Sequence, residues 1–390
     1  MLRSLYSGIS GLRSHQAMLD VTGNNIANVN TTGFKASAVQ FRDTLSQLTQ
    51  GAGAAIPTAG GTNPSQIGLG VQVAGISTNF SQGSTQATGR ATDILISGEG
   101  FFITQQAGET FYTRSGSFDF DASGRLVTPD GAMVQGWTGV NGVVDEGGPV
   151  GAITLPLEAV SSAAVSTSAT MDGNLPTDAA VGTVLTRDVR VFDASGAARS
   201  LSLSFTRTGT GWDVAAADAN GATGTGTLEF TAGALTAGGT LAVGGITVDM
   251  TKLTGFAGIT TATVSNQNGR TAGTLNSFSI SKDGTLVGSF SNGSTEAIAR
   301  IAVATFTNSG GLEKAGGSSY RASVNSGAAV LGGPGTGGAG SLVGGALEMS
   351  NVDLSQEFTN LIVAQRGFQA NARIITTSDD VLQELTNLKR

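Results

Sequence analysis

The sequence predicts an α+β protein that is mainly β, with an α-helix at each end of the chain and antiparallel β domains nested between them. Near both ends, apolar residues recur at three- and four-residue spacing, which is the helical period. In between, apolar and polar residues alternate over 71–76, 201–205 and 301–304, which is typical of strands. The 59 glycines among 390 residues favour turns over long helices.

The first helix is expected over residues 1–26. Its apolar residues form one stripe, which is interrupted at Gln16 and Gly23. A stripe of this period predicts a seam that packs against another helix. The apolar members of this seam are Leu2, Leu5, Ile9, Leu12, Leu19 and Ile26.

The second helix is expected to begin after Asp353, whose carboxylate can act as the N-cap, with Gln356 at the spacing of a capping box. Its apolar residues lie on two stripes, and a helix that is apolar on two sides needs neighbours on two sides. The seam residues predicted on these stripes are Leu354, Phe358, Leu361, Phe368, Ile375, Leu382 and Leu385.

The middle of the chain is expected to form antiparallel sheets joined by tight turns. The string FDASG occurs at 120–124 and at 192–196, and similar Asp- and Gly-containing turns occur at 218–221 and 282–284; these residues are typical of hairpins. Composition then divides the chain into nested layers. The expected layers are a helical inner domain (1–30 and 350–390), connecting loops (31–70 and 326–349), a middle β domain (71–149 and 265–325) and an inserted outer β domain (150–264).

Bulk composition argues against several classes of protein. The formal net charge is −7 without a basic patch, and nucleic-acid binding needs clustered Lys and Arg. No run approaches the roughly 18 apolar residues of a membrane span, and the N-terminal segment lacks the apolar block of a secretory signal. With zero cysteines, neither a disulfide nor a thiolate nucleophile is available. We expect no nucleic-acid partner and no membrane insertion.

Candidate catalytic and metal-binding residues are few. His15 is the single histidine and is expected on the surface of the first helix. Residues 119–130 partly match a calcium loop, but Asp130 stands where a bidentate Glu belongs and flanking helices are missing, so a hairpin turn is expected. The glycines at 68–70 lack the Lys and the strand-to-helix setting of a phosphate loop. The sequence predicts no enzyme and no cofactor.

The terminal helices can form a pair within one subunit or a contact between subunits. Small residues interrupt both helices, and each interior glycine costs about 1 kcal/mol relative to alanine, so the first helix is weak alone. Gly-rich segments separate both helices from the β domains, and no β core is expected to cover them. The spacing leaves both arrangements open.

Both terminal segments resemble the signatures of bacterial flagellar rod and hook proteins. The first contains SLYSGISGL at 4–12 and NNIANVNTTGFK at 24–35, and the second is SNVDLSQEFTNLIVAQRGFQANARIITTSDDVLQELTNL at 350–388. The order and spacing of the N-terminal blocks are highly specific to this family. The residues that carry the motif are Asn24, Asn25, Ile26, Ala27, Asn28, Thr32, Gly33, Phe34 and Lys35.

Internal blocks extend the resemblance to nearly the whole chain, most weakly at 213–264. Residues 78–102 and 112–137 are similar to the shared middle domain of this family. Residues 171–212 and 292–327 resemble the hook branch rather than the rod branch. A distal rod protein is similar only in the outer parts and lacks the inserted domain.

The resemblance implies a structural subunit of the flagellar hook, a curved tubular joint that transmits torque from rod to filament. It implies export through the flagellar type III apparatus and a position outside the cell near the basal body. The implied partners are other copies of the chain and the rod, hook cap and hook–filament junction proteins. The alternatives are a distal rod protein, a secreted β-rich surface protein or adhesin, and a cell-wall enzyme; the last two would need a cleavable signal or a cleft with paired acids.

Overall fold

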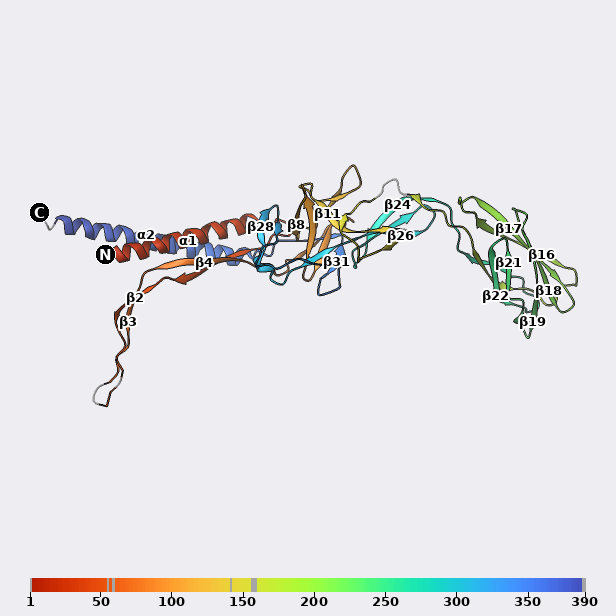
Figure 1. Cartoon of the computed structure of the whole chain (residues 1–390), viewed down its shortest axis with the longest axis horizontal. Coiled ribbons are helices and arrows are strands. Elements are labelled where there is room, and N and C mark those ends of the chain that lie inside the picture. The colour runs from red at the N-terminus through yellow and green to blue at the C-terminus, as the bar shows by residue number, and fades with distance from the viewer. Residues whose placement is uncertain (1, 55, 58–59, 141, 156–159, 388–390) are drawn as a thin grey trace. The chain divides into compact units, whose positions relative to one another are not determined.

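The computed structural model describes residues 2–54, 56–57, 60–140, 142–155 and 160–387. Helix α1 (Leu2–Ala27) and helix α2 (Leu354–Asn387) lie at the two ends of the chain, and strands make up most of the rest (Figure 1). The predicted class, mainly β with terminal helices, is confirmed. Within the described residues, neither helix is both long and apolar enough to cross a membrane.

The chain divides into two compact units. Unit 1 contains Met1–Leu155, Ser279–Val287 and Ala297–Arg390, and unit 2 contains Pro156–Phe278 and Gly288–Glu296. The sequence expectation separated the terminal helices from the middle β domain, whereas the structure combines them in unit 1. It also ended the inserted domain at 264, because composition does not change at the point where the chain leaves unit 2.

The start of α2 follows the sequence prediction closely. The carboxylate of Asp353 accepts hydrogen bonds from the backbone N–H groups of Ser355 and Gln356, at 2.8 and 3.2 Å. Asp353 is therefore the N-cap. The side chain of Gln356 donates to Asn360 at 3.1 Å instead of reaching back, so the capping box is not closed.

Two antiparallel strand pairs form an arm in unit 1 (Figure 1). The expectation of a connecting loop over 31–70 is therefore wrong, because the glycines and prolines that suggested it belong to the arm's tip. Residues 326–349 also carry short strands, which are too brief to show a period. The arm strands are β1 (Ser37–Asp43), β2 (Ser46–Gln50), β3 (Ser65–Gly68) and β4 (Val71–Thr78).

The β core of unit 1 is built from strands that are far apart in the chain. Its principal sheet runs in the order β26–β11–β7–β8–β29–β28, and aromatic rings of Phe101, Tyr112, Trp137 and Tyr320 fill one side of it. These strands are β7 (Phe101–Gln106), β8 (Glu109–Thr113), β11 (Met133–Val140), β26 (Thr295–Ile301), β28 (Glu313–Gly316) and β29 (Ser319–Arg321).

Shorter elements complete unit 1 and the connections to unit 2. Strands near the start of the core pair with strands near the end of the chain, β5 with β32 and β6 with β31. The remaining elements are β5 (Thr85–Ala87), β6 (Ile94–Ser97), β9 (Asp119–Phe120), β10 (Leu126–Val127), β12 (Val143–Val144), β13 (Gly151–Ala152), β14 (Val160–Ser161), β24 (Gly273–Ile280), β25 (Thr285–Phe290), β27 (Val303–Thr305), η1 (Ser309–Gly311), β30 (Val330–Gly332), β31 (Ser341–Gly344) and β32 (Ala346–Glu348).

Unit 2 is a nine-stranded sheet around its own apolar core, in which Phe205 and Trp212 are fully buried. Most neighbours are antiparallel, as predicted, but β15 and β22 run parallel, so the prediction of a purely antiparallel domain is wrong at this pair. The strands are β15 (Ser168–Asn174), β16 (Val184–Phe192), β17 (Ala198–Arg207), β18 (Gly211–Asp218), β19 (Thr223–Thr231), β20 (Ala234–Ala237), β21 (Thr240–Val243), β22 (Ile246–Thr254) and β23 (Thr263–Gln267).

The predicted hairpin turns are present. In the turn between β16 and β17, Asp193 accepts hydrogen bonds from Ser195 N and Ala197 N at 2.9 and 2.8 Å. Gly196 adopts a φ of 83°, a conformation that costs a glycine little. The turn between β18 and β19 is closed by Gly221 N donating to Asp218 O at 2.8 Å.

Candidate assembly interface

Helices α1 and α2 pack against each other through small residues. Gly8 lies against Ile374 and Ile375, and Gly11 lies so close to Asn371 that an added Cβ would stand 2.5 Å from its side-chain oxygen. Across the pair, Gly367 lies under the ring of His15. Glycine on each side removes the bulk that would otherwise hold the helices apart. The small residues that weaken the isolated helix therefore have a packing role.

His15 is part of this contact, contrary to the expectation of a surface position. It is half-buried, and its ring also meets Phe41 of the arm edge-on, at 5.9 Å between centroids. Its Nδ1 is buried and makes no hydrogen bond among the described residues. The arm further contacts α1 where Val71 N donates to Ser10 Oγ at 3.2 Å. A β hairpin thus covers part of the helix pair, which the sequence did not indicate.

The predicted seam residues divide between the inside and the outside of the pair. Leu354 and Phe358 are exposed, at 40% and 51%, so they lie outside the contact. The side chains of Leu2 and Leu385 lie outside the described part of the structure. The half-buried members of the seam are Leu5, Ile9, Leu12, Leu19, Ile26, Leu361, Phe368, Ile375 and Leu382.

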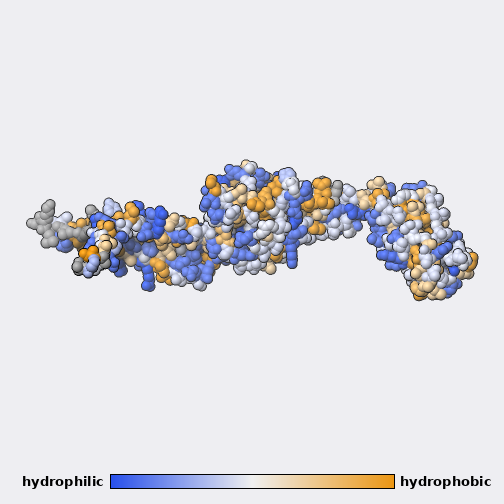
Figure 2. Space-filling model, turned by 60° about the horizontal axis from the view of Figure 1, so that its bottom comes forward, coloured by the Kyte–Doolittle hydropathy of each residue, from blue (hydrophilic) through white to orange (hydrophobic). Residues whose placement is uncertain are grey.

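Helix α2 also carries large apolar side chains that the described part of unit 1 leaves 40% or more exposed. Figure 2 shows hydrophobic residues interspersed with hydrophilic ones on the surface of the helix pair. Leu354, Phe358 and Ile362 recur every four residues along one side of the helix, whereas Val363, Ile374 and Val381 lie on a second side. Each is between 40% and 54% exposed. We call these six residues the outer stripe.

The motif at residues 24–35 forms the junction between α1, the arm and α2. Asn25 is 1% exposed. Its amide donates to Ser37 O at 2.8 Å and to Glu357 Oε1 at 3.0 Å, while its oxygen accepts from Ser37 N at 3.0 Å. One buried amide therefore ties three elements together, because a buried polar group left unpaired is costly.

The rest of the motif turns the chain from α1 into the arm. Asn28 bonds Asn24 and accepts from Thr31, which closes the last turn. Thr32 lies 3.3 Å from the hydroxyl of Ser115. Gly33 has a φ of 68°, and any Cβ there would collide with the backbone of Ser115. Glycine is required at this position for both reasons. Among the other motif residues, Ile26 and Phe34 are half-buried and Ala27 is exposed.

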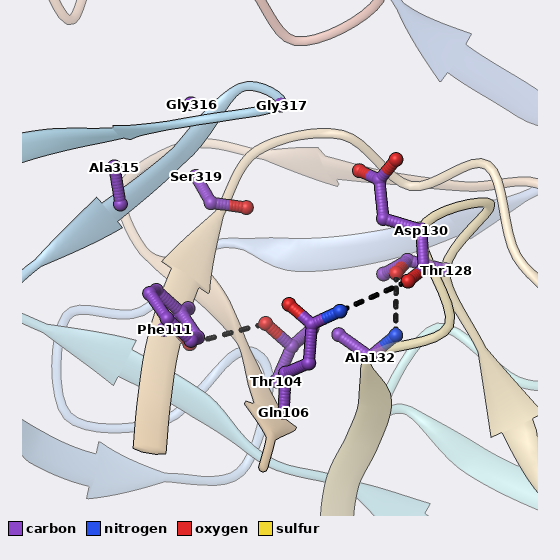
Figure 3. A pocket seen from close by; sticks show the side chains of 10 residues that line it. All are labelled: Thr104, Gln106, Phe111, Thr128, Asp130, Ala132, Ala315, Gly316, Gly317 and Ser319. Carbon is purple, nitrogen blue, oxygen red and sulfur yellow. Dashed lines mark hydrogen bonds between the residues drawn. The ribbon is translucent and has the colours of Figure 1, made fainter.

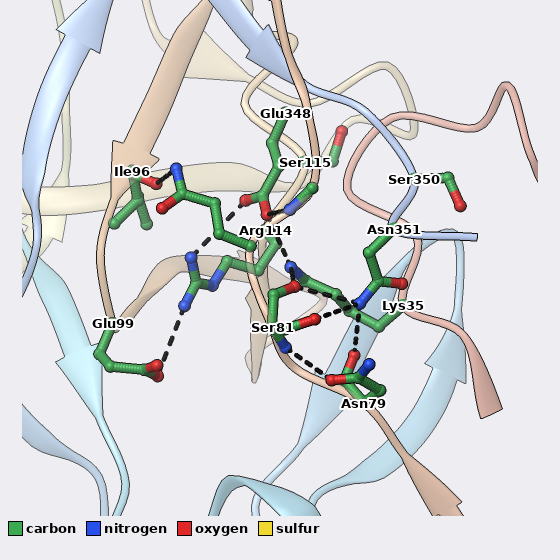
Figure 4. Close-up of polar contacts among 12 residues, drawn as sticks. Lys35, Asn79, Ser81, Ile96, Glu99, Arg114, Ser115, Glu348, Ser350 and Asn351 are labelled. Atoms are coloured by element: carbon green, nitrogen blue, oxygen red, sulfur yellow. Dashed lines mark hydrogen bonds and ion pairs between the residues drawn. The ribbon is translucent and has the colours of Figure 1, made fainter. Parts of the chain in front are cut away.

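Lys35 ends the motif in a buried ionic cluster (Figure 4). Its ammonium lies 2.6 Å from Glu348 Oε1 and donates to Ser81 O at 2.8 Å, and the side chains of Lys35 and Glu348 are both 0% exposed. Arg114 approaches the other oxygen of Glu348 at 3.6 Å and donates to Gly98 O at 2.8 Å. The cluster joins the N-terminal motif, the β core and the last strand before α2.

Burial lowers the pKa of Lys35, and the hydrogen bond and charge of Glu348 oppose this shift. Burial also lowers the pKa of Arg114, again against the attraction of Glu348. The two cations depend on one carboxylate, because Glu99, the second acid near Arg114, is 72% exposed at 3.7 Å. Removing one partner of a buried pair costs on the order of 3–5 kcal/mol. The cluster therefore makes the junction sensitive to single substitutions.

A cavity of about 260 Å³ lies between β7, β8 and the β28–β29 hairpin (Figure 3). Among its ten lining residues, Asp130 is the one with an acidic or basic side chain. Two of the polar side chains are hydrogen-bonded within unit 1: Gln106 donates to Asp130 O at 3.0 Å and Thr104 donates to Phe111 O at 3.3 Å. This lining supplies no acid–base pair for catalysis.

The calcium-like segment is a hairpin turn, as expected. Asp121 accepts from Ser123 N and Arg125 N at 2.9 and 2.8 Å, and its second oxygen pairs with the Arg125 guanidinium at 2.7 Å. Hydrogen bonds from Arg125 hold the pKa of this carboxyl below its usual value. No group of three or more possible metal ligands occurs in the described part of the chain.

Three family models match the chain. They are described as flagella basal body rod protein over residues 5–35, flagellar hook protein FlgE/F/G D1 domain over 95–181, and flagellar basal body rod FlgEFG protein C-terminal over 343–388. The first and last matches coincide with α1 and its motif and with α2. The flagellar hook protein FlgE of Treponema pallidum is 36% identical, with all of both chains covered. The chain belongs to the flagellar hook and basal-body rod protein family.

Other members of the family are equally similar. The flagellar hook protein FlgE of Borreliella burgdorferi is 37% identical, and the flagellar basal-body rod protein FlgG of Bacillus subtilis is also 37% identical. In each case all of both chains is covered. The prediction of a structural flagellar protein is confirmed, and percentage identity alone does not separate hook from rod.

Sequence reasoning found Lys35 but not its partners. Glu348 lies 313 residues away, and Arg114 lies in a different strand region, so no local period connects the three. One signal in the sequence could have indicated the cluster. Each of the three charged residues stands in a segment that is otherwise uncharged, as Glu348 does in GGALEMSN. A charged residue in such a setting is rarely fully buried unless it is paired.

Proposed function

We propose that this chain is the structural subunit of a bacterial flagellar hook, in which copies polymerise through their terminal helices into a curved joint. The joint transmits torque from the rod to the filament. The rod, hook cap and hook–filament junction proteins are its partners at the two ends of the polymer, and the type III export apparatus delivers it outside the cell.

The outer stripe of α2 is the observation that supports polymerisation most directly. It presents six large apolar side chains, each at least 40% exposed, on two sides of one helix, while a third side packs on α1. Exposed apolar surface of this kind marks a protein contact. Covering it with neighbouring copies would stabilise the polymer by roughly 25 cal/mol for each Å² of apolar surface buried.

The exposed helices, with three glycines in α1 and one in α2, also suit export in an unfolded state. We expect residues 1–30 and 350–390 to order fully only when the subunit joins the polymer, since backbone ordering costs about 1–2 kcal/mol per residue. Hydrogen exchange on dilute monomer measures this directly. Strong protection of the amides between Leu5 and Leu19 would contradict the expectation.

The sharpest test of polymerisation is a substitution on the outer stripe. Phe358→Asp places a charge at a 51% exposed position, so monomer folding is unaffected while the polymer contact is lost. Val184→Asp in unit 2, at a 56% exposed position, makes the same kind of change away from the helices. Electron microscopy of the purified variants should show tubes for Val184→Asp but not for Phe358→Asp. Normal tubes for Phe358→Asp would contradict the proposed contact.

A basal-body rod protein is the second candidate, because the Bacillus subtilis relative carries that name. The basal bodies of a strain that lacks this protein distinguish a hook subunit from a rod subunit. Loss of the hook from basal bodies that retain a complete rod supports the hook subunit. Basal bodies that end inside the rod would assign the chain to the rod.

A further inference from the structure

Helix α2 extends past the start of α1. Facing residues across the pair are Gly11 and Asn371, His15 and Gly367, and Asn25 and Glu357. The two numbers add to 382 in each pair, so Leu2 stands level with Asp380. Helix α2 continues to Asn387, and residues 381–387 therefore project roughly 10 Å beyond α1 at 1.5 Å per residue. Figure 1 shows this overhang at the free end of the pair.

The overhang presents an apolar and an acidic side chain to solvent. Val381 is 47% exposed. Glu384 is the single acidic residue among 381–387, is exposed, and makes no ion pair within the described part of the chain. A carboxylate beside an apolar side chain is suited to a site that offers a cation and an apolar wall.

A notch of about 290 Å³ with these properties lies at the opposite end of α1. Asn24, Asn28 and Thr31 form its wall on the helix side, Phe34 forms an apolar surface, and the β28–β29 hairpin forms the other side. The notch is too small for a helix but accommodates side chains from a helix end.

Lys314 supplies the cation of this notch. Its residue is exposed overall, but its ammonium lies against the motif, donating to Ser37 Oγ at 2.8 Å and standing 5.1 Å from the centre of the Phe34 ring. Desolvation at this end of the side chain lowers the pKa of Lys314. No described carboxylate forms an ion pair with it, although Asp20 lines the adjoining groove.

We infer that the α2 overhang of one copy docks in the Lys314 notch of a second copy, with Glu384 paired to Lys314 and Val381 against the apolar wall. The inference rests on the proposed polymerisation. The contact cannot form within one copy, because overhang and notch lie at opposite ends of the helix pair. It joins two different surfaces and displaces the copies along the helix axis, and a heterologous contact with such a displacement generates an open polymer rather than a ring.

The contact also sets a distance between copies. Glu384 stands four residue positions beyond Leu2, the first residue of α1, and the notch lies at residues 24–28. Contacting copies are therefore displaced by roughly 40 Å along the helix axis at 1.5 Å per residue. Helical reconstruction of the polymer should contain a pair of neighbours with this displacement.

Reversal of the two charges tests the pairing. Lys314→Glu and Glu384→Lys should each raise the critical concentration for polymerisation by roughly tenfold, and the double variant should return it to within about threefold of the original, because opposite charges are again paired. Lys252→Glu and Glu229→Lys, two exposed changes in unit 2, are the matched controls and should have little effect. The urea transition followed by Trp137 fluorescence verifies that unit 1 remains folded.

The outcomes distinguish a failure of the docking contact from a failure of the proposed function. If the unaltered chain fails to polymerise, the proposed function fails first. If it polymerises and Glu384→Lys does so equally well, the docking site is wrong. Glu384 is exposed at the helix tip, so this variant does not depend on the fold of the notch. A double variant that is no better than Lys314→Glu would also overturn the pairing.

Discussion

Unit 1 draws its strands from both ends of the chain, whereas unit 2 is built mostly from strands that pair with the next one along. In unit 1, β5 and β6 pair with β32 and β31, across about 250 residues or more of chain. In unit 2, β16, β17, β18 and β19 form successive hairpins. Non-local pairing is costly until the whole chain is present. We therefore expect unit 2 to fold without unit 1, and unit 1 to need both ends of the chain.

The interiors of the two units differ in the same way, because the interior of unit 1 also depends on distant parts of the chain. Unit 1 buries Lys35, Arg114 and Glu348 together, from three distant parts of the chain. The core of unit 2 is an apolar cluster that includes Trp212 and Phe205, and its most buried ion pair, Arg199 with Asp218, retains 16% exposure at the arginine. A buried ionic cluster tolerates the loss of a partner less well than an apolar contact does. Unit 1 is therefore stable only when these three parts of the chain are in place together.

Truncation at residue 340 should have the largest effect. It removes β31, β32, Glu348 and α2, which leaves the buried Ile94–Ser97 strand without a partner and two buried cations without their carboxylate. We expect unit 1 to lose its cooperative unfolding transition completely while unit 2 keeps its own. The chain contains two tryptophans, Trp137 in unit 1 and Trp212 in unit 2, so fluorescence can report each unit.

Single-tryptophan variants make this test unambiguous. Trp212→Phe leaves the reporter of unit 1, and Trp137→Phe leaves the reporter of unit 2. The full-length chain with each replacement is the control for urea unfolding. A cooperative Trp137 transition in the truncated chain would show that unit 1 does not depend on its C-terminal strands.

Glu348→Gln should have the next largest effect. It keeps the shape of the side chain but leaves Lys35 and Arg114 buried with no full negative charge, at a cost of about 3–5 kcal/mol. The free energy of unfolding reported by Trp137 should fall by that amount, and the value reported by Trp212 should stay the same. Glu99→Gln, at a 72% exposed position beside the same arginine, is the matched control and should change little.

The parts of the fold that were predictable are those with local physical causes. The period of apolar residues predicted both helices, the Asp353 carboxylate predicted where α2 begins, and the FDASG strings predicted two turns. Each depends on residues within a few positions of one another. The motif at 24–35 could be recognised as a unit because its hydrogen bonds close a turn within the same segment.

The parts that were missed depend on distant or weakly marked contacts. The arm up to residue 70 was taken for a loop because its tip is rich in Gly and Pro, and strands β2 and β3 are exposed on both faces, which removes the alternation that was visible in β4. The parallel pairing of β15 with β22 is not visible in either strand. His15 was placed on the surface because its partner is Gly367. A glycine has no side chain and so adds nothing to the apolar pattern of α2.

Val214→Ala should produce a smaller effect, confined to unit 2. Val214 is 1% exposed within the apolar core. Removing two methyl groups should cost about 2 kcal/mol, from lost burial and a small cavity. The Trp212 transition should shift accordingly and the Trp137 transition should remain. Val184→Ala, at an exposed position in the same unit, serves as the control, and a shift of the Trp137 transition would show that the units unfold together.

Tyr320→Phe should have the smallest effect near neutral pH and a measurable one only in alkali. Burial raises the pKa of Tyr320 to about 12, above the ordinary tyrosine pKa of 10.0 that applies when the chain is unfolded. The protonated phenol therefore stabilises unit 1 fully below pH 10, and this contribution is lost as the pH rises towards 12. At pH 11 the original chain should have lost about 1 kcal/mol relative to Tyr320→Phe. Unfolding followed by Trp137 across this range, with Tyr6→Phe at an exposed helix position as the control, measures the difference. Parallel pH curves for the original chain and Tyr320→Phe would mean that the ring at Tyr320 is open to water in solution, and that the aromatic side of the unit 1 core is looser than the apolar core of unit 2.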